Sequence, residues 1–183
     1  VLDKAVAIFC EKGYNATSAA DLVKALGLSR SSIYGTFKDK RTLFILALDH
    51  YRKKQVASML RMVRNSDNIP ETIAEIFRMI VDQDITARLP KGCFMVNTGI
   101  ELGPHDRQIA DLIVANDADI EKTFTEALDM GQQRGQISKK HDPLLLARFL
   151  SNNISGLRVA VKSSRDRQPL DDVIELCLAT LKP

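Results

Sequence analysis

Hydrophobic residues recur along this chain with the spacing of one helix face rather than in alternation with polar residues. Between Leu2 and Cys10 they occupy positions i, i+3, i+4, i+7 and i+8, and Gly13 ends the pattern. No segment shows sustained alternation with β-branched residues, so we expect no β-sheet. The pattern predicts an all-α fold of about nine helices, at residues 2–12, 17–26, 30–37, 40–64, 70–87, 92–102, 105–130, 143–165 and 170–182.

Side chains that can cap a helix stand where four of these segments begin. Thr17 is expected to cap the second helix, Ser29 the third, Asp39 the fourth and Asp142 the eighth, because their oxygens accept hydrogen bonds from first-turn amides. Gly27 closes the second helix after only two or three turns. The second and third helices are therefore short, and the turn LGLS joins them.

Two short helices joined by a tight turn that contains glycine have the layout of a helix-turn-helix motif. The third helix begins with Arg30, Ser31 and Ser32. Small side chains allow the backbone close to DNA bases, and Arg30 can donate two hydrogen bonds to a guanine edge. We expect further polar side chains to lie near phosphates and to fix the register of the helix: Thr17, Tyr34, Thr36, Lys38 and Lys40.

The charge of the chain is unevenly distributed. Residues 1–54 hold 10 Lys and Arg against 5 Asp and Glu, whereas the rest of the chain holds 16 against 18. An excess of five positive charges on one segment favours a polyanionic partner at that end. The alternative is that the segment is only three packed helices, with Ser29 as a cap and residues 38–41 as a solvated face.

The stretch AVAIFCEKGYNATSAADLVKALGLSRSSIYGTFKDKRTLF, residues 5–44, resembles the DNA-binding domain of the TetR family of bacterial transcriptional regulators. Three spaced patterns carry the resemblance: F-x-x-x-G-[YF]-x-x-T-[ST], then L-G-[VL]-S, then [IL]-Y-x-x-F-x-[DN]-K-x-x-L. The resemblance implies a helix-turn-helix domain at residues 1–45 and a larger ligand-binding and dimerisation domain at residues 46–183. It further implies that the protein is a repressor released from its operator by a small-molecule ligand.

The resemblance also assigns roles to single residues. Thr17, Tyr34 and Lys40 match phosphate-contacting positions of the family. Gly35 departs from the aromatic or larger residue often found at its position, which leaves base contact there open. The positions that would touch bases or flanking phosphates are Arg30, Ser31, Ser32, Gly35 and Thr36.

The segment KGCFMVNTGIEL, residues 91–102, resembles a G-C-x-x-x-N block of one subgroup, in which the corresponding helix lines the ligand cavity. A ligand pocket needs mostly apolar walls and a few fixed polar groups. The pocket is therefore predicted to include Phe77, Phe94, Asn97, Glu101 and Phe124. The alternative is that these are core residues and that Asn97 caps or bridges helices.

The three cysteines, Cys10, Cys93 and Cys177, lie far apart in sequence and form no C-x-x-C pair. This spacing indicates neither a disulfide framework nor a metal site, and it fits a cytoplasmic protein with buried thiols. Some members of the family signal through a cysteine, so a redox-sensing or electrophile-sensing role for Cys93 is an alternative to a ligand. A regulator that responds to no ligand is a further alternative.

Residues 143–182 are apolar over too wide an arc to pack on one side only. Ser155 and Gly156 lie near the middle of the first of these two helices, where small residues allow close helix approach. The resemblance implies that the two helices pair with their copies in a homodimer. A two-fold dimer would place two recognition helices in successive major grooves of a pseudo-palindromic operator, about 34–36 Å apart.

The remaining features exclude other classes of protein. The three histidines, His50, His105 and His141, are scattered, and no nucleophile–base constellation accompanies them, so we expect no catalytic residues, no cofactor and no enzyme activity. The apolar runs FILAL and PLLLA are far shorter than the roughly 20 residues of a membrane span. Since the chain begins without Met and within a predicted helix, we expect a short N-terminal arm to precede it.

Overall fold

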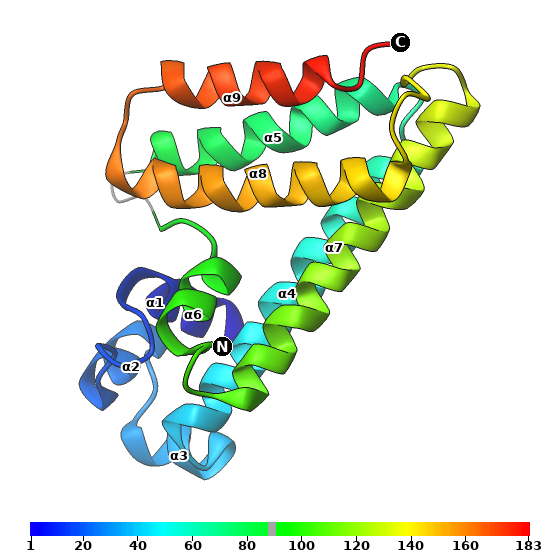
Figure 1. The fold of residues 1–183 in the computed structure, drawn as a ribbon. Helices are drawn as coiled ribbons and strands as arrows, with labels where there is room; N and C mark the ends of the chain where they lie inside the picture. The colour runs from blue at the N-terminus through cyan, green and yellow to red at the C-terminus, as the bar shows by residue number, and fades with distance from the viewer. Residues whose placement is uncertain (88–90) are drawn as a thin grey trace. The chain divides into compact units, whose positions relative to one another are not determined.

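The computed structural model describes residues 1–87 and 91–183, and these residues form nine helices and no strand. The predicted all-α fold is confirmed (Figure 1). The helices are α1 (Leu2–Lys12), α2 (Ala19–Leu26), α3 (Arg30–Phe37), α4 (Lys40–Arg64), α5 (Ile69–Ile85), α6 (Phe94–Leu102), α7 (Arg107–Gln133), α8 (Pro143–Ser163) and α9 (Gln168–Ala179).

Side-chain caps fix several of the helix starts. The Ser29 hydroxyl accepts from the Ser32 amide at 3.1 Å, Asp39 from the Thr42 amide at 2.7 Å, and Asp142 from the Leu144 amide at 2.9 Å. These three predicted caps are confirmed. An unpredicted cap, Asn68, accepts from the Glu71 amide at 3.2 Å, so α5 begins slightly earlier than expected.

The predicted cap of the second helix, Thr17, is wrong by one residue. Ser18 is the N-cap of α2: its hydroxyl accepts from the Asp21 amide at 3.1 Å, and the Asp21 carboxylate accepts from the Ser18 amide at 2.9 Å. This reciprocal pair is a capping box. The Thr17 hydroxyl instead points back to α1 and donates to the Gly13 carbonyl at 2.5 Å, so it cannot serve the first turn of α2.

The chain divides into two compact units, each of which combines two separate stretches of the sequence. The first contains Val1–Gln55 and Cys93–Val114, and the second contains Val56–Gly92 and Ala115–Pro183. The functional division predicted at residue 45 remains a prediction, but the compact units differ from it because α6 and the start of α7 pack with the first four helices. Helices α4 and α7 each contribute residues to both units.

The core of the first unit joins aromatic rings from three separate helices. Phe44 of α4 meets Phe9 of α1 edge to face, with ring centroids 4.9 Å apart, and Phe94 of α6 at 5.4 Å. All three rings are at most 1% exposed. Edge-to-face pairs of this kind add to the stabilisation from burial. Residues 93–114 therefore complete the core on which the helix-turn-helix rests.

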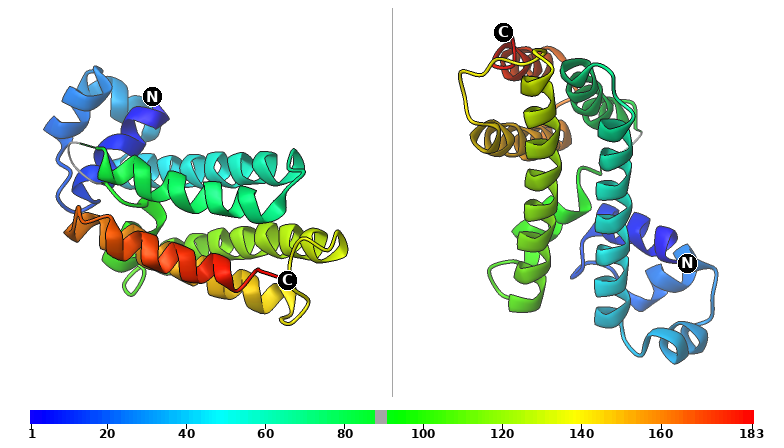
Figure 2. Two further views of the ribbon diagram at one scale, coloured as in Figure 1. Left: turned by 90° about the horizontal axis from the view of Figure 1, so that it is seen from above. Right: turned by 90° about the vertical axis from the view of Figure 1, so that its right-hand side faces the viewer.

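In the second unit, α5, α8 and α9 lie side by side, as Figures 1 and 2 show. Their buried residues form one hydrophobic cluster with those of α7. Helices α8 and α9 also carry hydrophobic side chains that point away from this cluster: Leu145 is 58% exposed, Phe149 41% and Leu176 68%. No helix in the described part of the chain is long and apolar enough to cross a membrane.

Candidate DNA-binding interface

The first turn of α3 exposes a compact group of three serine hydroxyls. Ser29 Oγ lies 2.9 Å from Ser31 Oγ and 2.8 Å from Ser32 Oγ, and it also accepts from the Ser32 amide. All three side chains are exposed. Both predicted base-contacting serines therefore lie at the surface, with their hydroxyls held close to the helix cap.

Helix α3 also combines a buried anchor with an exposed cation. Ile33 is 1% exposed and fastens α3 to the core of the first unit, whereas Arg30 faces solvent. The Arg30 guanidinium carbon lies 5.8 Å from the centre of the half-buried Tyr34 ring. A cation over an aromatic face is weakly attracted to it. This contact holds the arginine beside the tyrosine that is predicted to touch phosphate.

The end of α3 exposes the other residues of the predicted interface. Gly35, Thr36 and Lys38 are all exposed. Lys38 follows the helix with φ 65°, and its amide donates to the Tyr34 carbonyl at 2.9 Å. Positive φ is uncommon for a residue with a side chain. This conformation ends α3 after eight residues and lets the chain turn into α4.

Lys40 and Thr17 have structural partners that the sequence did not reveal. The Lys40 ammonium donates to the Tyr14 and Thr17 carbonyls, each at 2.8 Å, and lies 4.4 Å from the centre of the Tyr14 ring. Thr17 is fully buried. Both residues therefore hold the turn between α1 and α2, and their phosphate contacts remain predictions.

Glu101 binds the same turn from its amide side. Its carboxylate accepts from the Tyr14 amide at 2.9 Å and from the Asn15 amide at 2.8 Å. Gly13, with φ 81°, leaves room for the carboxylate, because a Cβ there would lie 2.7 Å from Glu101 Oε2. Glycine adopts positive φ without steric cost. The sequence offers no spacing signal that pairs Glu101 with residues almost ninety positions earlier.

Asn97 connects α6 to α1. Its side-chain amide nitrogen lies 3.4 Å from the Cys10 carbonyl of α1, to which it donates. The structure therefore shows the bridging arrangement that was the alternative to a pocket role for Asn97. Together with Glu101 it connects α6 to the end of α1, within the first unit.

A further ion pair fixes the start of α4 in the first unit. The Arg41 guanidinium binds the Asp106 carboxylate through both terminal nitrogens and donates to the Gln108 side chain at 2.9 Å. Asp106 also accepts from the Ile109 amide at 3.2 Å, in the first turn of α7. The adjacent guanidinium lowers the pKa of the Asp106 carboxyl. Sequence reasoning missed this pair.

The five residues predicted to line a ligand pocket divide between the two units. Phe77 and Phe124 are fully buried in the core of the second unit, and Phe94 is 1% exposed in the core of the first. Asn97 and Glu101 make the contacts with α1 and its turn that are described above. The structure thus gives all five a packing or bonding role, and ligand binding by them remains a prediction.

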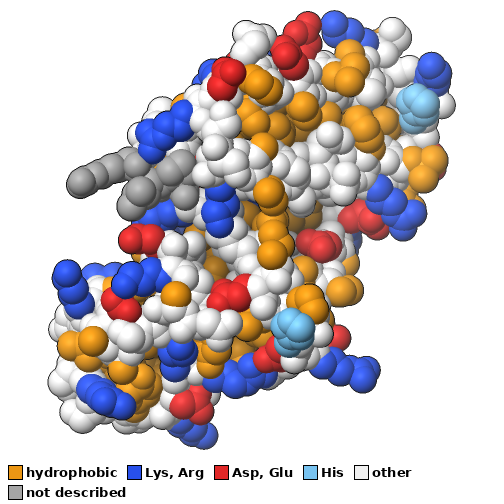
Figure 3. Space-filling model, turned by 60° about the vertical axis from the view of Figure 1, so that its left-hand side comes forward, with side chains coloured by type: hydrophobic (Ala, Val, Ile, Leu, Met, Phe, Trp, Pro, Cys, Tyr) orange, Lys and Arg blue, Asp and Glu red, His pale blue; other side chains and the backbone are white. Residues whose placement is uncertain are grey.

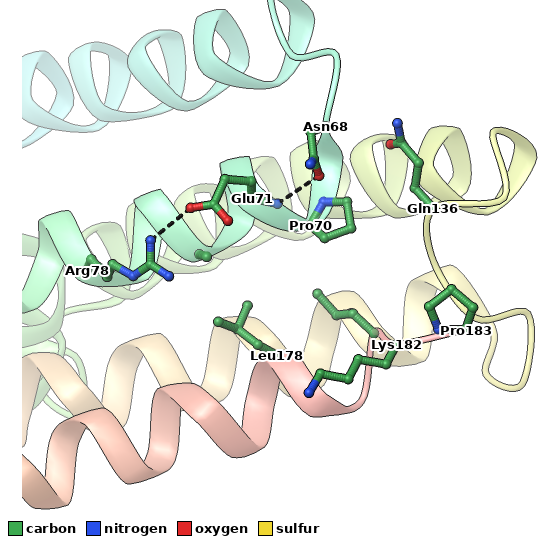
Figure 4. Close-up of a pocket in the computed structure, with 10 residues that line it drawn as sticks. Asn68, Pro70, Glu71, Arg78, Gln136, Leu178, Lys182 and Pro183 are labelled. Carbon is green, nitrogen blue, oxygen red and sulfur yellow. Dashed lines mark hydrogen bonds and ion pairs between the residues drawn. The ribbon is translucent and has the colours of Figure 1, made fainter.

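The second unit has an open pocket of about 260 Å³ elsewhere, where α5 meets the end of α9 (Figure 4). Its charged wall is an exposed ion pair, with Arg78 Nη1 2.8 Å from Glu71 Oε1. None of the five predicted ligand residues contributes to it. The lining residues are Asn68, Pro70, Glu71, Ala74, Arg78, Gln136, Leu178, Leu181, Lys182 and Pro183.

The three thiols differ in their surroundings. Cys93 is 8% exposed, and the Tyr51 hydroxyl donates to its sulfur at 3.6 Å. Cys177 is buried in the second unit, and this burial raises the pKa of its thiol. Cys10 is half-buried. Within residues 1–87 and 91–183, no group of three or more His, Cys, Asp and Glu side chains is placed to hold a metal ion.

Positive charge does not form one continuous patch on the face shown in Figure 3, where Lys and Arg side chains alternate with carboxylates and hydrophobic groups. Several cations of the first unit are paired within it. Lys54 lies 2.9 Å from Asp3, and Lys12 binds Asp21 at 2.5 Å. The Lys12 ammonium lowers the pKa of the Asp21 carboxyl, and the Ser18 hydrogen bonds contribute further. Arg30 and Lys38 remain exposed on and beside α3.

Comparison with known proteins identifies two matching sequence families. Residues 1–47 match the family described as bacterial regulatory proteins, tetR family. Residues 71–177 match the family described as tetracyclin repressor-like, C-terminal domain. The two matches fall on the helix-turn-helix segment and on the larger helical segment.

Curated relatives and solved structures agree with these matches. The chain is 32% identical over 182 residues to the HTH-type transcriptional repressor ComR of Escherichia coli, covering 99% of this chain and 85% of ComR. It is 30% identical to YezE of Bacillus subtilis, an uncharacterised HTH-type transcriptional regulator, covering 99% of this chain and 94% of YezE. A CifR cysteine mutant in complex with 26-bp operator DNA is similar in structure, with a TM-score of 0.85, 26% identity, and coverage of 98% of this chain and 94% of CifR.

Proposed function

This chain belongs to the TetR family of bacterial transcriptional regulators, and from this premise we propose that it is a repressor that leaves its operator when a small molecule binds. The exposed first turn of α3 carries the DNA-binding part of the proposal. Arg30, Ser31 and Ser32 face solvent there, on a helix that Ile33 anchors to the core. An exposed helix start with short polar side chains suits direct contact with base edges in a major groove.

The residues around this turn divide into base contacts and phosphate contacts. We assign base or flanking contacts to Arg30, Ser31, Ser32, Gly35 and Thr36. We assign phosphate contacts to the exposed Lys38 and to the Tyr34 hydroxyl, because such contacts fix register and orientation rather than sequence. Thr17 and Lys40 support the interface from behind, since both hold the turn between α1 and α2. Any phosphate contact by Lys40 has to share its ammonium with that turn.

We further propose that the active form is a homodimer through residues 143–182, which acts in the cytoplasm. The exposed hydrophobic side chains of α8 and α9 support this, among them Leu145 and Leu176. Apolar surface of this kind is stabilised by burial against a second copy. Two copies related by a two-fold axis would read a pseudo-palindromic site. We assign no catalytic role to the chain.

The direct test is binding of the purified chain to the promoter region beside its own gene, measured by fluorescence anisotropy at low salt. We expect tight binding that weakens steeply as salt rises, because binding releases condensed cations from the phosphates and this release becomes less favourable at high salt. A scrambled duplex of equal length is the control. Failure to bind the promoter region more tightly than the scrambled duplex at any salt concentration would reject the proposal.

The ligand is tested separately. A small molecule can release DNA only in proportion to its preference for the unbound arrangement of the protein. A screen of compounds against the preformed complex should therefore find molecules that lower operator affinity and also raise the thermal midpoint of the unbound chain. If no compound in a broad metabolite set does both, the chain represses without a small ligand.

A second candidate signal is modification of Cys93. This residue immediately precedes α6, the helix whose Asn97 binds α1 and whose Glu101 binds the turn between α1 and α2. Cys93 is 8% exposed, and modification of its sulfur would disturb the packing beside Tyr51. Iodoacetamide labelling of the folded chain, read by peptide mass, tests this candidate. An unlabelled Cys93 after labelling of Cys10 would exclude direct sensing by this thiol.

A further inference from the structure

Gly35 lies in the recognition helix at a position where nothing in the fold requires a glycine. It is exposed within α3, and a Cβ built on it would have no atom within 4 Å. It is also not among the glycines with positive φ. Glycine inside a helix is less favourable than alanine, because its backbone loses more freedom on folding. Neither packing nor backbone conformation therefore explains Gly35.

Three other glycines of the chain have local explanations. Gly27 ends α2 with φ 70°, and Gly13 has φ 81° beside the Glu101 carboxylate. Gly131 lies inside α7, where a Cβ would be 2.5 Å from Ile137 Cδ1. Each of these positions disfavours a side chain for a reason within the molecule. Gly35 has no such reason, and it shares this property with Gly156, which is exposed in the segment predicted to pair with a second copy. For Gly35 we therefore consider a reason outside the chain.

The surroundings of Gly35 indicate what that reason is. Ser31 and Ser32 precede it by four and three residues, so each lies next to Gly35 on the helix surface. Both hydroxyls bond to Ser29 Oγ, at 2.9 and 2.8 Å. The exposed face of α3 thus carries two short side chains and one hydrogen atom, while the longer Arg30 lies beside the Tyr34 ring.

We infer that Gly35 is a specificity-determining residue: its missing side chain lets the α3 backbone approach the base edges closely, and operator preference depends on that approach. This inference rests on the proposed DNA-binding function. Hydrogen bonds to bases form only over a narrow range of distance. A side chain at position 35 would hold the helix away from the groove floor, or from a thymine methyl group that fits against the glycine.

The test starts from a duplex of about 30 base pairs that the wild-type chain selects from a random-sequence library, long enough for two half-sites. Gly35→Ala and Gly35→Leu are then compared with wild type. We expect both variants to raise the thermal midpoint by about 2–4 °C, as helix propensity requires. We expect affinity for the selected duplex to fall at least about tenfold for alanine and further for leucine, since discrimination at a single base is worth about this much.

Two further measurements separate specificity from general damage. Affinity for a scrambled duplex and the salt dependence of binding should stay at wild-type values, because phosphate contacts supply them. Ala118→Gly makes the reverse exchange at an exposed position inside α7. It should lower the thermal midpoint by a similar amount and leave affinity for the selected duplex unchanged.

The possible failures are distinguishable. If the wild-type chain enriches no sequence from the library, the proposed function itself is rejected. If wild type binds and Gly35→Ala binds within about twofold of it, the inference about Gly35 is wrong and the proposed function stands. A parallel loss on selected and scrambled duplexes, or a lowered thermal midpoint for Gly35→Ala, would also overturn the inference, because either result indicates a structural role.

Discussion

At the scale of single residues, two opposite charges hold the turn between α1 and α2. The Lys40 ammonium donates hydrogen bonds to two carbonyls of the turn, whereas the Glu101 carboxylate accepts hydrogen bonds from two of its amides. Each charge thus meets the end of the peptide dipole that it favours. Hydrogen bonds to charged groups are stronger than those between neutral groups. The turn that precedes the helix-turn-helix is therefore fixed by residues outside it.

Removal of the Glu101 carboxylate should destabilise the chain. Glu101→Ala leaves the Tyr14 and Asn15 amides without their acceptor, and the loss of such bonds costs about 1–2 kcal/mol in the free energy of unfolding. Urea unfolding at pH 7 measures the loss. Glu126→Ala is the control, because its exposed carboxylate lies 4.0 Å from Lys122 in a surface pair. Equal stabilities of the two variants would contradict the prediction.

Asp106 should make the stability depend on pH in the acid range. Arg41 holds the pKa of this carboxyl below its ordinary value of 3.8, so the folded chain binds fewer protons there than the unfolded chain. The resulting stabilisation is present above about pH 4 and is lost as the pH falls through the lowered pKa. Asp106→Asn should therefore lose less stability than wild type between pH 7 and pH 3.

Urea unfolding at the two pH values measures this difference. Asp111→Asn, which removes an exposed carboxylate of α7, should retain the wild-type pH dependence. If Asp106→Asn loses as much stability in acid as Asp111→Asn, the ion pair does not contribute to acid sensitivity.

At the scale of the elements, α6 belongs to the unit that carries the recognition helix. Its first residue, Phe94, packs against Phe44 of α4 and is 1% exposed. Phe94→Ala should lower the free energy of unfolding by about 3–5 kcal/mol, the range for removal of a buried aromatic ring. The variant should also lose operator affinity at temperatures where the first unit unfolds. Urea unfolding and anisotropy together measure both effects.

The control for this prediction lies on the same helix. Ile100 is 68% exposed, so Ile100→Ala should change stability by at most about 0.5 kcal/mol, as is usual for surface substitutions. A comparable loss of unfolding free energy in both variants would contradict the prediction, because the burial of Phe94 would then make no difference.

The helices themselves could be predicted from the sequence, because local spacing and capping residues decide them. Ser29, Asp39 and Asp142 were identified from sequence alone as caps. The choice between Thr17 and Ser18 as the cap depends on which hydroxyl points back to the end of α1. The sequence alone does not show this, because both adjacent residues carry a hydroxyl. The partners of Glu101 could not be predicted for a different reason. The amides that donate to its carboxylate belong to residues almost ninety positions earlier, and only the tertiary structure brings them together.

The exposed side chains of α3 could likewise be predicted, since its motif specifies which residues face outward. The division of the five predicted pocket residues between two compact units could not. Periodicity shows that Phe77, Phe94 and Phe124 are buried, but it does not show with which helices each one packs. That assignment requires the tertiary structure.

At the scale of the whole molecule, residues 143–182 leave apolar surface that the chain does not cover. Leu176 is 68% exposed on α9, and Leu145 is 58% exposed on α8. If these residues form the homodimer interface, a charge placed there should prevent association. Burial of an unpaired carboxylate in an apolar interface is far more costly than its exposure in water. Leu176→Glu should therefore sediment as a monomer at micromolar concentration, where wild type sediments as a dimer.

The same variant links assembly to DNA binding. A monomer presents one recognition helix and loses the second half-site, so its affinity for a pseudo-palindromic operator should fall by a factor of at least about 100. Val114→Glu is the matched control, because Val114 is also hydrophobic and 67% exposed but lies outside residues 143–182. It should remain dimeric and bind the operator as wild type does. Because α3 is intact in both variants, a dimeric Leu176→Glu chain, or a monomeric Val114→Glu chain, would place the interface elsewhere.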